Sequence, residues 1–130
     1  MGAQLRIPLV AIFIVNALLG CSASGILGTD IHEPPSLSMV VAHDLVITNN
    51  RLRHANIEFD GSGDESPVEI VRKYVEKLVG DGWTLGEMDT ADNRAAARLT
   101  RDDRMLRFVV ERTSDAERPL VGVLEVESTW

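Results

Sequence analysis

The sequence predicts an α+β fold, a two-layer sandwich in which one amphipathic helix covers one face of an antiparallel sheet. Three observations carry this prediction. A helix-capping motif begins at Ser66, stretches of alternating apolar and polar residues lie on both sides of it, and short turn signals separate those stretches. The expected element order is β-β-α-β-β-β-β, with the helix packed on the apolar face of the sheet.

Two strands are expected before the helix. Residues 38–48 are rich in Val, Leu and Ile, as strands are. Asn49-Asn50 then predicts a turn, because Asn tolerates a positive φ better than most residues. Residues 51–59 alternate in polarity, so one face of that strand is apolar. Its members are Ala55, Ile57 and Phe59.

The helix is bounded by clear signals at both ends. Ser66 is a good N-cap, Pro67 suits the first helical position, and Glu69 completes a capping box. Gly80 and Gly82 are expected to end the helix. An apolar stripe at helical spacing predicts the face that meets the sheet, and it consists of Val68, Val71, Tyr74, Val75, Leu78 and Val79.

Four strands are expected after the helix, over residues 83–88, 94–100, 104–112 and 120–127. In the first of them Trp83 and Leu85 would point the same way, with Trp83 as a core anchor. A two-residue loop at Asp102-Asp103 sets the register of the hairpin around it. The facing pairs in this register are Leu99 with Leu106, Ala97 with Phe108 and Ala95 with Val110.

The opposite face of the sheet is expected to be charged and solvated. It would carry Glu58, Arg98, Arg107, Glu111, Glu125 and Glu127. The hairpin register places Arg98 opposite Arg107, which is unfavourable for like charges. Either glutamates on neighbouring strands offset the two charges, or the arginines hold a carboxylate or phosphate group. Arg98 and Arg107 are therefore the candidate contacts for an anion or a partner.

No catalytic set, cofactor or metal site is predicted. His43, His54 and Asp44 could approach one another across the first hairpin, but a zinc site needs a third or fourth protein ligand in fixed geometry. A Gly/Ser loop holds three carboxylates without the spacing of an EF-hand, which favours a solvated turn: Asp60, Asp64 and Glu65. No Gly-x-Ser-x-Gly elbow, phosphate-binding loop or His-Glu-x-x-His motif is present.

The first 20 residues have the pattern of an export signal. Arg6 precedes the apolar stretch of residues 7–15, which is too short to span about 30 Å of hydrocarbon. The stretch leads into Leu18-Leu19-Gly20-Cys21, which resembles the lipobox of bacterial lipoproteins. An ordinary secretory signal and a membrane span are the alternatives.

The lipobox resemblance implies that Cys21 carries lipid on its sulfur and becomes the first residue of the mature chain. The position of Leu19 more often holds a smaller residue in that family. The chain then divides into a signal peptide at 1–20, a lipidated N-terminus with a flexible tether at 21–36, and one small domain at 37–130. The resemblance places the protein in the cell envelope, on the periplasmic face of either membrane or at the cell surface.

Charge and cysteine content narrow the possible partners. The formal net charge is −7, and loss of Arg6 with the signal would make it −8, which argues against nucleic acid as a partner. Cys21 is the only cysteine, so its lipidation would leave no thiol for a disulfide.

A second resemblance concerns the stretch from Ser66 to Val110. A capped helix runs into Gly80-Asp81-Gly82-Trp83 and then into a hairpin, which is similar to small uncharacterised envelope lipoprotein domains with a helix on a sheet. It is also loosely similar to accessory lipoproteins of the outer-membrane barrel-assembly machinery. These resemblances imply a non-enzymatic interaction or scaffolding module with an envelope protein as partner. The alternative is a binding protein for a small anionic ligand held by the two arginines.

Overall fold

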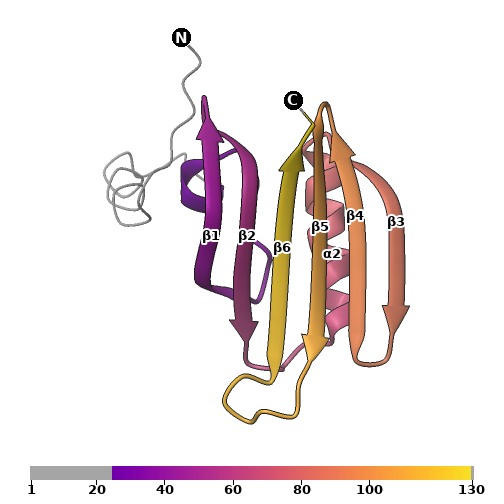
Figure 1. Ribbon diagram of the computed structural model, residues 1–130. Coiled ribbons are helices and arrows are strands. Elements are labelled where there is room, and N and C mark those ends of the chain that lie inside the picture. The colour runs from indigo at the N-terminus through magenta and orange to yellow at the C-terminus, as the bar shows by residue number, and fades with distance from the viewer. Residues whose placement is uncertain (1–24, 130) are drawn as a thin grey trace.

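Six antiparallel strands form a single sheet in the spatial order β1-β2-β6-β5-β4-β3 (Figure 1). The computed structural model describes residues 25–129, so the predicted signal peptide, Cys21 and Trp130 lie outside the described residues. The strands are β1 (Ser38–Thr48), β2 (Arg51–Gly61), β3 (Thr84–Ala91), β4 (Arg94–Arg101), β5 (Arg104–Arg112) and β6 (Leu120–Ser128). One α-helix, α2 (Pro67–Gly80), separates the first two strands from the rest, so the predicted α+β class and element order are confirmed.

The turns that set the register behave as their residue types require. Asn49 and Asn50 both have a positive φ, which the tight β1–β2 turn needs. Asp102 also has a positive φ, in the two-residue loop between β4 and β5. The three predicted facing pairs of that hairpin are all confirmed. The β3–β4 hairpin was not predicted to the residue: β3 continues to Ala91, and its loop is residues 92–93.

The ends of α2 follow from local hydrogen bonds. The Ser66 side chain accepts a bond from the Glu69 amide, as a capping box requires. At the other end Gly82 has a φ of 105°, and the Trp83 amide donates to the Leu78 carbonyl in a Schellman-type closure. This closure turns the chain back and buries Trp83 to 2% exposure.

The buried face of α2 differs in part from the predicted stripe. Ile70 is fully buried, whereas Val68 is half-buried and Val79 is 48% exposed. The helix packs on β3, β4 and β5, and the ring of Tyr74 meets that of Phe108 edge to face at 4.7 Å. Leu85 lies opposite the buried Leu99 on the face covered by α2, but it is 40% exposed on the edge strand β3.

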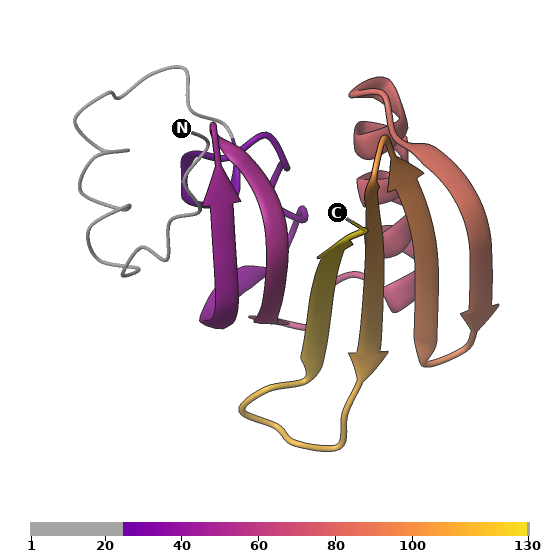
Figure 2. The ribbon, with the colours of Figure 1, turned by 45° about the horizontal axis from the view of Figure 1, so that its top comes forward.

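The flexible tether expected over residues 21–36 is not found where this segment is described. Residues 25–37, which we call the strap, pack against the domain instead, between the β1–β2 hairpin and α2 (Figure 2). The strap includes a short 3-10 turn, η1 (Ile26–Gly28). Ile26 and Ile31 are 1% and 0% exposed. Composition suggested a solvated linker, but these apolar side chains complete the core that α2 leaves uncovered.

Close approach and hydrogen bonds fix the strap at both ends. Leu37 packs closely over Gly122 of β6: a Cβ there would lie 2.9 Å from the Leu37 Cδ1 atom, so a larger residue would shift this side chain. The buried Tyr74 hydroxyl donates to the His32 carbonyl at 2.5 Å, and the Asp30 amide donates to the Asn50 carbonyl at 2.9 Å. The strap therefore links the helix to the β1–β2 turn.

A buried ion pair ties the strap to the sheet. The side chain of Arg104 has no exposed surface, and its Nη2 lies 2.8 Å from Asp30 Oδ2. Arg104 Nη1 also donates to the Leu52 carbonyl at 3.2 Å, and the guanidinium lies 5.1 Å from the centre of the Trp83 ring. Sequence reasoning placed this arginine only beside the predicted turn, where the strand over 104–112 begins, because its partner is 74 residues away.

Replacing Asp30 with Asn is expected to destabilise the chain by about 3 kcal/mol, because a buried guanidinium then loses its counter-charge. The matched control is Asp102→Asn, which removes an exposed partner of Arg51 and is expected to cost less than about 1 kcal/mol. Urea denaturation followed by tryptophan fluorescence measures both. Equal midpoints for the two variants would contradict this role of Asp30.

Candidate functional site

The sheet face turned away from α2 and the strap has no cover within residues 25–129, and we call it the open face. Strand pairing arranges its side chains in rows that run across the sheet. The charged row consists of Asn56, Glu125, Arg107, Arg98 and Glu87. The next row, which we call the apolar row, consists of Glu58, Val123, Val109, Ala96 and Asp89.

The charged row places Arg98 opposite Arg107, as the sequence predicted. Each arginine has a carboxylate on its outer side. Arg98 Nη2 lies 3.2 Å from Glu87 Oε1, and Arg107 Nη1 lies 3.5 Å from Glu125 Oε1. This geometry matches the first sequence alternative, in which neighbouring glutamates offset the like charges. Both pairs are well exposed, so they contribute little to folding and can exchange partners.

The apolar row is the part of the open face that the sequence analysis missed. Val109 and Val123 face each other across β5 and β6 and are half-buried, and Ala96 beside them is 9% exposed. A fully solvated, charged face was expected here. The sequence did hold a signal, because the runs 108–110 and 120–124 are apolar on both strand faces, which is typical of strands covered on both sides.

A shallow hollow of about 110 Å³ lies over the β3–β4–β5 side of the open face. Arg94, Arg98 and Arg107 line it together with two carboxylates, Glu87 and Asp89. The lining has one more arginine than carboxylates, but each arginine lies within 4 Å of a glutamate: Arg94 of Glu111, Arg98 of Glu87 and Arg107 of Glu125. An anion that bound there would have to displace Glu87 from Arg98, so the geometry suits a surface of mixed charge better than a free anion.

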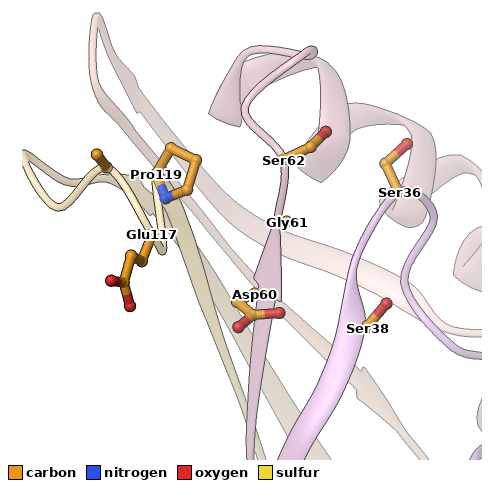
Figure 3. A pocket seen from close by; sticks show the side chains of 8 residues that line it. Ser36, Ser38, Asp60, Gly61, Ser62, Glu117 and Pro119 are labelled. Atoms are coloured by element: carbon orange, nitrogen blue, oxygen red, sulfur yellow. The ribbon is translucent and has the colours of Figure 1, made fainter.

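A second concave region lies where β2 ends and β6 begins (Figure 3). This groove has a volume of about 480 Å³, and serine hydroxyls and the carboxylates of Asp60 and Glu117 line it. Asp60 lies 3.4 Å from Arg118, so its charge is partnered. The lining oxygens can accept or share hydrogen bonds, but the groove is lined by neither a cysteine nor a histidine.

The loop beside this groove, which was predicted to be a solvated turn, is partly held by hydrogen bonds to other elements. Glu65 accepts hydrogen bonds from Lys73 of α2 and from Ser36 of the strap. The pKa of Glu65 lies below its ordinary value, chiefly because of the hydrogen bond from Lys73 and next because of that from Ser36. Partial burial acts in the opposite direction. The Ser62 hydroxyl donates to Asp64 at 3.0 Å. Glu65 thus links the strap to the helix.

His43 and His54 do not lie opposite each other across the first hairpin, an approach that the sequence analysis had considered. Strand pairing puts His43 opposite Asn56 and His54 opposite Val46, because the register of β1 shifts between these positions. Within residues 25–129 no group of three or more His, Cys, Asp or Glu side chains is arranged to hold a metal ion.

Comparison with known proteins gives no match to a family model, to a curated protein or to a solved structure. Among residues 25–129, neither helical segment has the length and apolar character needed to cross a bilayer.

The stabilising contribution of Glu65 is expected to be lost in acid. Because the pKa of Glu65 is lowered on folding, its carboxylate stabilises the folded chain at pH values above the ordinary pKa of about 4.5. This stabilisation is lost as pH falls through the folded-state pKa. Glu65→Gln should therefore lower the urea midpoint at pH 7, and the difference from the unmodified chain should shrink as pH falls below about 4.5.

The control for this experiment is Glu76→Gln, at an exposed position of α2. Its midpoint should follow that of the unmodified chain at every pH. The titration of Glu65 would be contradicted if the urea midpoints of the Glu65→Gln variant and the unmodified chain differed by the same amount from pH 7 to pH 3.

Proposed function

We propose that this chain is a lipid-anchored module of the bacterial cell envelope that binds another protein through its open face and catalyses no reaction. Cys21 carries the lipid. The open face supplies the contact surface, with the apolar row as its centre and the charged row beside it. No cofactor is required.

The observation that carries this proposal is the apolar row on an otherwise uncovered sheet. Half-buried valines flanked by ion pairs have the make-up of a protein interface, in which an apolar centre is surrounded by polar groups. Six strands at about 4.8 Å spacing and eight residues at about 3.3 Å give roughly 750 Å² of face. That is close to the area of roughly 800 Å² that each partner buries in a standard interface.

The anchor part of the proposal rests on Leu18-Leu19-Gly20-Cys21 and its resemblance to the lipobox. Each acyl CH₂ that enters the bilayer contributes about 0.8 kcal/mol, and stable attachment takes two or more chains, as lipoproteins of this type carry. The packed strap begins at Gly25, so only residues 21–24 separate the lipid from the folded body.

The alternative function, a binding protein for a small anion, also uses Arg98 and Arg107. It needs both arginines to release the carboxylates of Glu87 and Glu125, which already lie at 3.2 and 3.5 Å. A protein partner with a mixed surface can instead form further pairs with the same four groups, so the charge pattern favours the protein partner.

Metabolic labelling with a clickable fatty acid tests the anchor. The full chain should be labelled in cells and recovered with the membranes, and the Cys21→Ala variant should lose the label because its acceptor sulfur is gone. A Cys21→Ala variant labelled as strongly as the unmodified chain would overturn the anchor.

Site-specific photocrosslinking tests the contact surface. A photoreactive residue at Val109 in the full chain should give protein adducts in cells, because this position is the centre of the open face. The same residue at Glu76, exposed on α2, is the matched control and should give few adducts. Adducts from Glu76 with none from Val109 would contradict the proposed surface.

A further inference from the structure

We propose that the protein bound by the open face is a second copy of this chain. The two sheets would pack face to face about a twofold axis that runs parallel to the strands, between β5 and β6. This inference rests on the proposed function, because it names the partner of the same surface.

The charged row is self-complementary about this axis. Arg107 on β5 lies opposite Glu125 on β6. A twofold axis between the two strands places β5 of one copy over β6 of the other. Arg107 then faces Glu125 of the partner subunit, and Glu125 faces Arg107 of the partner subunit. Each charge has an opposite charge beside it and another across the interface, which an isologous contact requires.

The apolar row obeys the same symmetry. Val109 on β5 lies opposite Val123 on β6, so the same axis sets Val109 over Val123 of the partner subunit. The valines of the two copies meet each other, and water leaves the centre of the face, while Ala96 faces Glu58 of the partner subunit farther from the axis. Aligned packing of two twisted sheets is a standard arrangement with about 10 Å between them.

An axis across the strands fails these requirements. If this axis ran along the charged row, it would set Arg107 against Arg107 of the partner subunit. If the axis ran between the two rows, it would place the charged row over the apolar row, and Arg107 would meet Val109 of the partner subunit. Burial of a guanidinium against apolar groups or against a like charge is costly. The row order therefore selects the axis parallel to the strands.

The position of the strap agrees independently with this axis. The Asp30 amide donates to the Asn50 carbonyl in the β1–β2 turn, so the first part of the strap lies at that end of the sheet. Rotation about an axis parallel to the strands keeps both straps at the same end. Two chains anchored through Cys21 can then enter one membrane. The axis across the strands would direct the anchors to opposite sides.

Charge exchange between differently tagged full-length chains tests the pairing. Arg107→Glu sets a glutamate against Glu125 of the partner subunit, and Glu125→Arg sets an arginine against Arg107 of the partner subunit. Like charges across an interface are strongly unfavourable, so each variant alone should lose about tenfold or more of its self-capture from detergent-solubilised membranes. When a variant meets itself, both facing pairs hold like charges. Co-expression of the two variants should restore capture, because in the mixed assembly a glutamate faces an arginine in both pairs.

Arg72→Glu is the matched control, since it makes the same charge change on the outer side of α2. It should keep full self-capture. Single variants that lose capture without recovery on co-expression would overturn the twofold pairing, and so would variants that retain capture unchanged.

A second measurement does not depend on charged variants folding well. Chains with Val109→Cys and Val123→Cys, made separately with different tags and co-expressed, should be joined by a short bis-maleimide. The spacer is needed because facing sheets lie about 10 Å apart. A chain with Glu76→Cys, on the exposed side of α2, should not be joined to the Val123→Cys chain, and joining as efficient as that of Val109→Cys would contradict the face-to-face pairing.

The two proposals fail in different ways. Photoadducts from Val109 that contain only other proteins would overturn the second copy as partner and leave the open face as a docking surface. An absence of adducts from Val109 would overturn both. Adducts of Val109 with a differently tagged copy of the chain support both.

Discussion

The ion pair between Asp30 and Arg104 is the interaction on which the rest of the structure depends. A guanidinium with no exposed surface must keep a counter-charge and acceptors, because the penalty for an unpaired buried charge is large. Asp30 supplies both carboxylate oxygens, and one of them also accepts the Leu52 amide at 3.2 Å. If the strap left the domain, the buried guanidinium of Arg104 would lose its counter-charge. A segment of small residues, glycine and proline therefore packs firmly.

The strap in turn decides the shape of the core. α2 has 14 residues and a diameter of about 10 Å, so it covers only part of a sheet that is roughly 29 Å wide. Ile26, Ile31 and Leu37 of the strap cover the strands that the helix does not reach. Both covering elements lie on one face. The apolar row on the other face is left without a cover from residues 25–129, and this asymmetry makes that face the candidate contact surface.

The fold could be predicted where neighbouring residues determine the structure. Alternation over 94–100 and 104–112, together with a two-residue turn, gave the β4–β5 register to the residue. Capping residues gave both ends of α2. The strap could not be predicted in this way, because its apolar residues show no period and its polar partner is distant in sequence. For the same reason Arg104 resembled an ordinary turn residue.

The candidate site was predicted in part. The opposition of Arg98 and Arg107 followed from the hairpin register, and their glutamate partners were one of two alternatives considered. The valines of the apolar row were overlooked because the charged residues of the same face dominate its pattern and hide the continuous apolar runs. Such runs indicate cover on both faces, and the second cover is a tertiary or quaternary feature that single-strand patterns do not identify.

The docked strap also relates the open face to the membrane. If Cys21 carries the proposed lipid, the chain from there to Gly25 spans at most about 14 Å, so the end of the sheet beside Asn50 would be held close to the bilayer. The strands then lead away from the membrane and the open face points sideways, toward molecules anchored in the same membrane. Confinement to one surface raises the effective concentration of such neighbours. In the proposed pairing of anchored chains, a face with a small apolar row and exchangeable ion pairs would therefore suffice for association, although the same contacts would be weak between chains free in solution.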